Sequence, residues 1–173
     1  MRQVWETSEV PAYLARAGWP GDPAAARGAL APYAVLATDT VLHLDVGSAV
    51  YPRLGLECYL GVPGGGDWSA TATAFFDRRG AAGLCVPSKR EGLLAWPGES
   101  RVPPARVALP PQVAATALLI GRAGATRYRR NVNHVKLSYT PGQPLEAKTY
   151  VSVTLSWPLR KAGTTPRLGS VEG

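Results

Sequence analysis

The sequence predicts an α+β fold in which helices cover one face of an antiparallel sheet. Stretches with helical spacing of apolar residues come before pairs of stretches in which apolar and polar residues alternate. In addition, Leu42–Val62 aligns without a gap on Asn133–Val153, at an offset of 91 residues and with four identities in 21 positions. We therefore expect two helix-helix-strand-strand repeats, over about residues 24–66 and 112–157.

The identities include both histidines of the chain. His43 falls on His134, and Tyr59 falls on Tyr150. Both copies also place Pro and Gly between two stretches of alternating character, which is typical of a hairpin. If an approximate two-fold relates the hairpins, these four side chains lie on one face of the sheet.

Two helices are expected at the N-terminal end. Thr7 or Ser8 is suited to cap a helix that ends at Arg16, before a stretch rich in Gly and Pro. An alanine-rich helix follows. We expect it to end near Leu30, because Pro32 lacks the N–H that a helix interior needs.

Each expected strand pair alternates with a period of two. Thr40–Gly47 and Arg53–Gly61 form the first hairpin, and Thr126–Tyr139 and Glu146–Trp157 form the second. Hairpin-connected strands are antiparallel, so no parallel crossover is required.

The middle of the chain is predicted to hold three helices and a loop. Asp67 caps a helix that ends at Gly80–Gly83, and Ser88 caps the next one. Residues 99–111 contain four prolines and predict a loop of polyproline character. Residues 112–122 then form an apolar, alanine-rich helix.

Composition favours one globular domain over residues 1–157, followed by a flexible tail over 158–173. Apolar residues make up 46% of the chain, which is enough for a core. No stretch approaches the length of a membrane span, and the first residues lack the apolar run of a signal peptide. Cys58 and Cys85 lack a CxxC spacing, which favours free thiols in a cytoplasmic protein.

The net charge of +7 comes mainly from arginine, as in proteins from bacteria with GC-rich genomes. The densest basic group is Arg127, Arg129 and Arg130, which we interpret as a basic rim for an anionic partner. No nucleic-acid-binding motif accompanies it, so nucleic acid is not the expected partner.

A strand period of two divides the hairpin residues between two faces. The core face should carry Leu54, Leu56, Cys58, Val135, Leu137 and Val151, with their apolar neighbours at the same parity. The opposite face should carry the polar group His43, Asp45, Glu57, Tyr59, His134, Lys136, Lys148 and Tyr150.

The polar group has two interpretations. At the offset of 91, Asp45 falls on Lys136 and Glu57 falls on Lys148, so these charges could form a ladder of cross-strand salt bridges. Alternatively, charges of both signs beside aromatic rings form a site for a polar and planar ligand.

Two kinds of catalytic site are disfavoured. His43 and His134, together with Asp45 or Glu57, offer the imidazoles and carboxylate of an iron or zinc site. However, the chain has no short His spacing, and nearby lysines would repel a cation. We therefore predict no metal and no cofactor. A G-x-S-x-G nucleophile elbow is also absent from the sequence.

The segment Ala-Lys-Thr-Tyr-Val, with Lys148 two residues before Tyr150, resembles a repeat of the aromatic prenyltransferase family, whose barrel is built from ααββ units. The resemblance covers the two hairpins, about 40 residues. It implies that Lys148 and Lys136 hold a diphosphate, that Tyr150 and Tyr59 shield an allylic cation, and that Glu57 orients an aromatic acceptor. The chain is too short for the closed barrel, so a half-barrel that forms a homodimer, or an unrelated sheet, is expected.

The lack of a specific catalytic motif favours a non-catalytic function. We expect an accessory or binding protein that holds a peptide or an anionic ligand on the polar sheet face or on the basic rim. A small transferase that uses the polar face is the alternative. A third possibility is a structural subunit of an assembly, in which the five tryptophans serve packing.

Overall fold

A computed structural model describes four parts of the chain, which are residues 9–61, 68–103, 110–119 and 125–157. These parts form two compact units. The first consists of the described residues up to Gly98 together with Arg130–Ser152, and the second consists of those in Glu99–Arg129 and from Val153 onward. The expected caps Thr7, Ser8 and Asp67 and the expected flexible tail lie outside the described residues.

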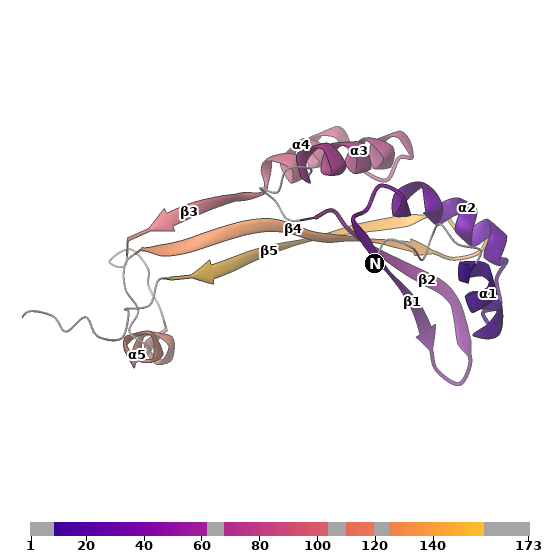
Figure 1. The fold of residues 1–173 in the computed structure, drawn as a ribbon, viewed down its shortest axis with the longest axis horizontal. Coiled ribbons are helices and arrows are strands. Elements are labelled where there is room, and N and C mark those ends of the chain that lie inside the picture. Colours follow the sequence, from indigo (N-terminus) through magenta and orange to yellow (C-terminus); the bar gives the residue numbers. More distant parts are fainter. Residues whose placement is uncertain (1–8, 62–67, 104–109, 120–124, 158–173) are drawn as a thin grey trace, which may run out of the picture. The chain divides into compact units, whose positions relative to one another are not determined.

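Four helices belong to the first unit: α1 (Glu9–Arg16), α2 (Pro23–Ala34), α3 (Trp68–Ala81) and α4 (Pro87–Ala95) (Figure 1). The expected end of α2 near Leu30 is wrong, because the helix continues past Pro32 to Ala34. Leu30 and Tyr33 are buried on this last turn, and their packing outweighs the missing proline N–H. The start of α4 also differs. Val86 is its N-cap and Pro87 its first residue, so Ser88 lies within the helix.

The described strands are β1 (Asp39–Val46), β2 (Val50–Tyr59), β3 (Gly98–Val102), β4 (Thr126–Tyr139) and β5 (Glu146–Ser156), and α5 (Pro111–Leu119) lies between β3 and β4. Both predicted hairpins are confirmed. The prediction of a loop from residue 99 onward is wrong at its start, since β3 pairs with β4 there. Main-chain pairing decides this segment, and Pro103 follows directly after the strand.

The sheet has the strand order β1-β2-β4-β3, and β5 also pairs with β4. Strand β2 is antiparallel to both β1 and β4. Leu56 lies opposite Leu42 on one side and Leu137 on the other, and Glu57 lies opposite Val41 and Lys136. This register places leucines beside one another on the core face, whereas the opposite face carries the exposed Val41 beside Glu57 and Lys136.

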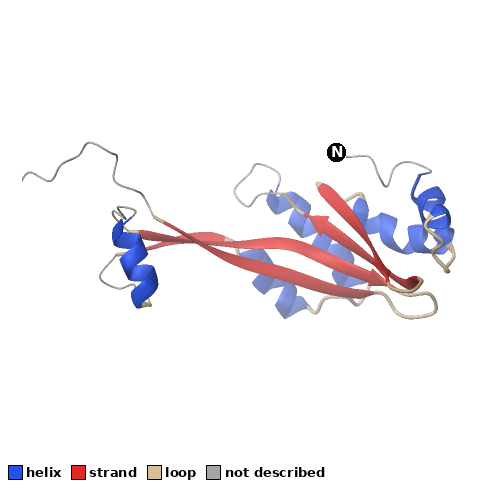
Figure 2. Cartoon of the chain, turned by 90° about the horizontal axis from the view of Figure 1, so that it is seen from below, coloured by secondary structure: helices blue, strands red, loops and turns tan. Residues whose placement is uncertain are grey.

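The core of the first unit lies between the helices and one face of the sheet (Figure 2). It joins the buried residues Leu30, Tyr33, Phe75 and Phe76 of the helices to Leu54, Leu56, Cys58, Val135 and Leu137 of the strands. The predicted core face is therefore confirmed on β2 and on the C-terminal half of β4. It is wrong for Val151, Val153 and Leu155 of β5, which are all exposed. The cover over Val151 is incomplete and leaves a pocket beside it.

The element order contains a helix-helix-strand-strand series twice, as α1-α2-β1-β2 and as α3-α4 followed, after β3 and α5, by β4-β5. The turns of the two hairpins do not match, however. The first spans residues 47–49 and the second spans residues 140–145. At the offset of 91, the second turn would fall partly inside β2. The duplication stays a prediction.

Candidate functional site

The carboxylate of Glu57 is the centre of a polar cluster on the sheet face opposite the helices. His43 Nε2 lies 3.2 Å from Glu57 Oε1, and His134 Nε2 lies 3.8 Å from the same oxygen. The Tyr59 hydroxyl donates a hydrogen bond of 3.0 Å to Glu57 Oε2. Residues from β1, β2 and β4 thus meet at one carboxylate, as their common strand parity predicts.

The contact between His43 and Glu57 is close but not aligned as a hydrogen bond. Nε2 of His43 is closed to solvent, and no acceptor in the described part of the chain meets it in hydrogen-bond geometry. A charged pair at 3.2 Å attracts without such alignment whenever the imidazole is protonated. The ring is therefore held near Glu57 mainly by charge and position.

An aromatic row adjoins this carboxylate. The ring of His134 stacks on Tyr150 at a centroid distance of 4.4 Å, and it lies 5.4 Å from the tilted ring of Tyr59. The three rings come from β2, β4 and β5, so the row crosses three strands. Such a row offers flat surfaces and polar edges together, which suits a planar or unsaturated group.

The cluster shifts the pKa of two of its members. Burial is the largest single effect on Glu57 and favours its neutral form. The hydrogen bond from Tyr59 and the charges of His134 and His43 together outweigh it, and the pKa of Glu57 is lowered. The pKa of Tyr59 is raised, first by its hydrogen bond to Glu57, then by burial and by the charge of Glu57. Glu57 is thus an anion with a bound hydroxyl donor at neutral pH.

Lys136 lies directly opposite Glu57 in the register, but its side chain takes another direction. It runs over Gly55, where an added Cβ would be only 2.7 Å from Lys136 Cε and 3.3 Å from Nζ. The same Cβ would be 3.4 Å from that of His43. The missing side chain of Gly55 thus leaves room for the lysine beside His43. Within the described residues, no carboxylate lies within 4.0 Å of its amino group.

The structure therefore brings together five of the eight predicted residues in direct contact, namely His43, Glu57, Tyr59, His134 and Tyr150. Lys136 adjoins them. Asp45 and Lys148 are exposed and make no ion pair with another described residue. The salt-bridge ladder in which Asp45 and Glu57 neutralise the two lysines is thus not formed among the described residues.

A further polar group on the same face was not predicted. Arg53 Nη2 donates to Ser138 Oγ at 3.2 Å and lies 3.5 Å from Glu146 Oε2. Arg53 has the same parity as Glu57 on β2, and this signal could have identified it. Its carboxylate partner on β5 could not be identified before the pairing was known.

The three arginines of the expected basic rim differ in their exposure. Arg127 and Arg129 are exposed, whereas Arg130 is half-buried and lies 5.6 Å from the centre of the Trp96 ring. An odd step along a strand reverses the side chain, so Arg130 does not share the face of the other two. Arg127 lies 4.0 Å from Glu99, which reduces the free charge of the remaining pair.

The described residues contain no group of three or more His, Cys, Asp or Glu side chains arranged to hold a metal ion. Both imidazoles of the polar cluster contact Glu57 itself. No helix among the described elements has the length and apolar character needed to cross a membrane.

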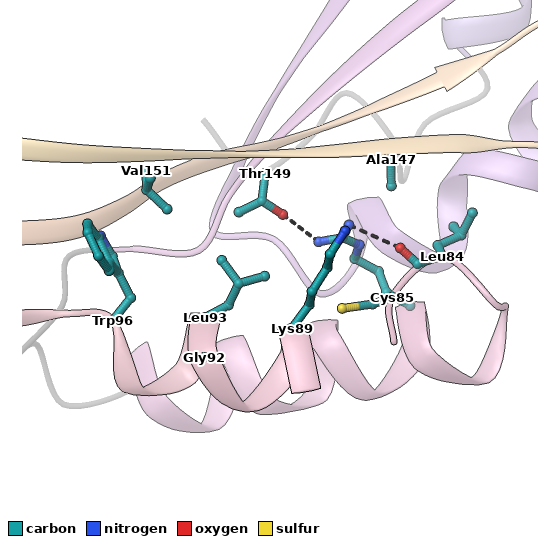
Figure 3. A pocket seen from close by; sticks show the side chains of 10 residues that line it. Leu84, Cys85, Lys89, Gly92, Leu93, Trp96, Ala147, Thr149 and Val151 are labelled. Carbon is teal, nitrogen blue, oxygen red and sulfur yellow. Dashed lines mark hydrogen bonds between the residues drawn. The ribbon is translucent and has the colours of Figure 1, made fainter. Parts of the chain in front are cut away.

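A pocket of about 530 Å³ lies on the other face of the sheet, between the α3–α4 region and β5 (Figure 3). It is lined by Arg79, Leu84, Cys85, Lys89, Gly92, Leu93, Trp96, Ala147, Thr149 and Val151. Arg79 lies in the helix that the sequence predicted before Gly80–Gly83, but the sequence assigned it no function. Only the tertiary arrangement reveals that this arginine lines a pocket.

Searches against protein-family models, curated proteins and solved structures found no match for this chain. The resemblance to aromatic prenyltransferase repeats therefore stays a prediction.

Proposed function

We propose that this chain is a binding protein that holds a small anionic ligand or an acidic peptide segment on the polar face around Glu57. The observation that carries the proposal is the position of Lys136. Its ammonium group lies beside His43 over the backbone of Gly55, with no described carboxylate to neutralise it.

The other charges on this face explain why an anion fits there despite the presence of Glu57. The carboxylate of Glu57 already accepts a hydrogen bond from the Tyr59 hydroxyl, and the imidazoles of His43 and His134 lie 3.2 and 3.8 Å from it. Its negative charge is therefore partly compensated within the cluster. Because no described carboxylate pairs with Lys136, its positive charge is available to attract a ligand anion.

The polar face supports this function better than the arginine rim does. Arg130 packs on Trp96 and Arg127 lies near Glu99, whereas Lys136 and Lys148 have no such described partner. The aromatic row of Tyr59, His134 and Tyr150 adds a flat contact surface that the rim lacks.

The alternative function is transfer of a prenyl group, as the resemblance implies. The specific observation in its favour is that Tyr59 and Tyr150 flank His134 next to Glu57, as a shield beside an orienting carboxylate would. Incubation with dimethylallyl diphosphate and an indole or phenol acceptor tests it directly. A prenylated product that disappears in Glu57→Gln would favour this transferase over a binding protein.

The binding proposal is tested by titrating the full chain with inorganic pyrophosphate and, separately, with a glutamate-rich peptide. Isothermal calorimetry gives the affinity, and the imidazole NMR signals of His43 and His134 report the place of binding. Lys136→Gln should weaken binding of the better probe by about tenfold, since a charge-assisted contact contributes about 1.5–3 kcal/mol.

Arg27→Gln is the matched control, because Arg27 is exposed on α2 and its removal changes the net charge equally. It should leave the affinity unchanged. If Lys136→Gln binds like the native chain while Arg127→Gln and Arg129→Gln bind weakly, the ligand belongs to the rim and the proposal for the polar face is wrong. If neither probe binds the native chain, anion binding on this face is rejected.

A further inference from the structure

The pocket beside β5 contains a buried cation without a carboxylate partner. Arg79 is only 4% exposed, and no carboxylate of the described residues lies within 4.0 Å of it. The groups that act on its charge are the thiols of Cys85 and Cys58 and the Tyr33 hydroxyl, none of which is a carboxyl group. Burial is the main cause that lowers the pKa of Arg79, yet a guanidinium stays protonated at neutral pH.

The hydrogen bonds of Arg79 leave part of its donor capacity unused. Nη1 donates to Thr149 Oγ1 at 2.7 Å, and Nη2 donates to the Leu84 carbonyl at 3.3 Å. Nε is buried and has no described partner. A guanidinium has five N–H donors, so these neutral acceptors satisfy only two of them. The guanidinium also lies 5.5 Å from the centre of the Phe76 ring. A buried charge without an anionic partner is still costly, and an anion would offset this cost.

The local fold holds the guanidinium at the pocket wall. Gly83 ends α3 with a φ of 71°, a conformation that glycine adopts without strain. After this turn, the Leu84 N–H donates to the Arg79 carbonyl at 2.8 Å, and the Leu84 carbonyl accepts from Arg79. The arginine is therefore fixed by its own helix end and, through Thr149, by β5.

The remaining lining combines apolar surface with a second cation. Leu84, Leu93, Trp96, Ala147 and Val151 supply apolar walls. The indole N–H of Trp96 already donates to the Asn131 carbonyl at 3.2 Å. Trp96 can therefore contact a ligand in the pocket only through the apolar surface of its ring. Lys89 rises from α4 toward β5 and also lines the pocket (Figure 3). None of the lining residues is acidic.

We propose that this pocket binds an organic carboxylate with an aliphatic chain, whose head group pairs with Arg79 and Lys89 and whose chain lies along the apolar walls. A volume of about 530 Å³ falls within the range of small-molecule sites. This site is on the face of the sheet opposite the Glu57 cluster, and it does not depend on the function proposed for that cluster.

The two cysteines provide a test with an internal reference. Cys85 is half-buried and lines the pocket, whereas Cys58 is fully buried and burial raises its pKa to about 12. N-ethylmaleimide should therefore alkylate Cys85 in the folded chain and leave Cys58 unmodified. Decanoate should slow alkylation of Cys85 by about tenfold at saturation, because its chain occupies the wall beside the thiol. Peptide mass spectrometry measures both rates.

The head-group preference is tested with two ligands that have the same chain. Decyltrimethylammonium and decanol should protect Cys85 far less than decanoate does. Equal protection by all three ligands would reduce the site to an apolar groove and overturn the proposal. Protection by none would overturn it too. A thermal-shift titration with decanoate is the second readout and does not depend on access of the alkylating reagent.

Two variants examine the cations. Arg79→Met keeps the side-chain volume and should fold, since an apolar replacement of a buried charge is often neutral or stabilising. It should bind decanoate about tenfold more weakly and lose the preference over decanol. Lys89→Glu reverses an exposed charge, and it tests the role of the cations if Arg79→Met fails to fold. Arg27→Gln is the control for net charge. Unchanged decanoate affinity in Lys89→Glu and in a folded Arg79→Met would contradict the proposal.

Discussion

Glu57 and Lys136 occupy opposite positions in the β2–β4 register, yet their charges do not pair. Glu57 contacts the imidazole of His43 on the neighbouring strand and the hydroxyl of Tyr59 on its own strand. Lys136 lies across Gly55 instead. Directly opposite residues of opposite charge usually attract, so this separation requires better partners for Glu57 and free space for the lysine. The two histidines and the glycine provide them.

The lowered pKa of Glu57 predicts a pH-dependent contribution to stability. A carboxyl group with a lowered pKa in the fold stabilises it above its ordinary pKa of 4.5, and this contribution disappears as the pH falls through the lowered value. Glu57→Gln should thus melt below the native chain at pH 7, and the difference should close in the acidic range. Thermal unfolding between pH 7 and pH 3 measures it. Glu91→Gln, a change at an exposed position of α4, is the control. Its melting temperature should not differ from that of the native chain in a pH-dependent way.

Tyr59→Phe should raise the pKa of the Glu57 carboxyl, because it removes the hydrogen bond that favours the anion. It should also reduce the free energy of unfolding by about 1 kcal/mol, as loss of one hydrogen bond does. NMR titration of the Glu57 side-chain carbon gives the pKa, and urea unfolding gives the stability. An unchanged pKa in Tyr59→Phe would mean that the imidazole charges alone set the titration of Glu57.

Gly55→Ala should reduce anion binding without unfolding the protein. The added Cβ would meet the flexible end of Lys136 at 2.7 Å, and this end can move away. Alanine is also better than glycine within a strand by about 0.5–1 kcal/mol, which offsets the rearrangement. Calorimetry with pyrophosphate should show weaker binding. Gly28→Ala on α2 is the matched control, because nothing lies within 4 Å of its new Cβ. Equal affinity in both variants would argue against a role for Lys136.

Leu56→Ala and Val151→Ala should differ strongly in stability. Leu56 is 0% exposed in the core, so its truncation should cost about 2–4 kcal/mol. Val151 is 48% exposed at the pocket, and its truncation should cost about 0.5 kcal/mol or less. Urea unfolding of both variants checks this. A large loss in Val151→Ala would indicate that the side of β5 next to α4 is covered in solution.

The sequence predicted those parts of the fold that depend on local patterns. Alternation with a period of two was sufficient to locate both hairpins and to assign Leu54 and Leu56 to one face and Glu57 and Tyr59 to the other. Helical spacing was sufficient for α3, whose described start and end agree with the prediction. In each case one face of an element is buried, and this constraint appears directly in the sequence.

Other features required the pairing of distant segments. Strand β3 has no apolar alternation of its own and exists because β4 offers a partner. Continuation of α2 past Pro32 depends on the burial of Tyr33 against Phe75. For the same reason, the sequence predicted that His43, Glu57 and His134 share one face. It did not predict which residues each of them contacts.

The sequence by itself determined the two hairpins, the existence of the helices, and the face on which the polar residues gather, because burial of one face sets the local periods of strands and helices. Only the tertiary structure decided that the carboxylate of Glu57 lies near two imidazoles, that the side chain of Lys136 lies over Gly55, and that Arg79 is a buried cation beside β5. Charge pairing and pockets depend on distances between segments far apart in the chain. Those distances are set by strand register and by helix packing, which a local pattern does not contain.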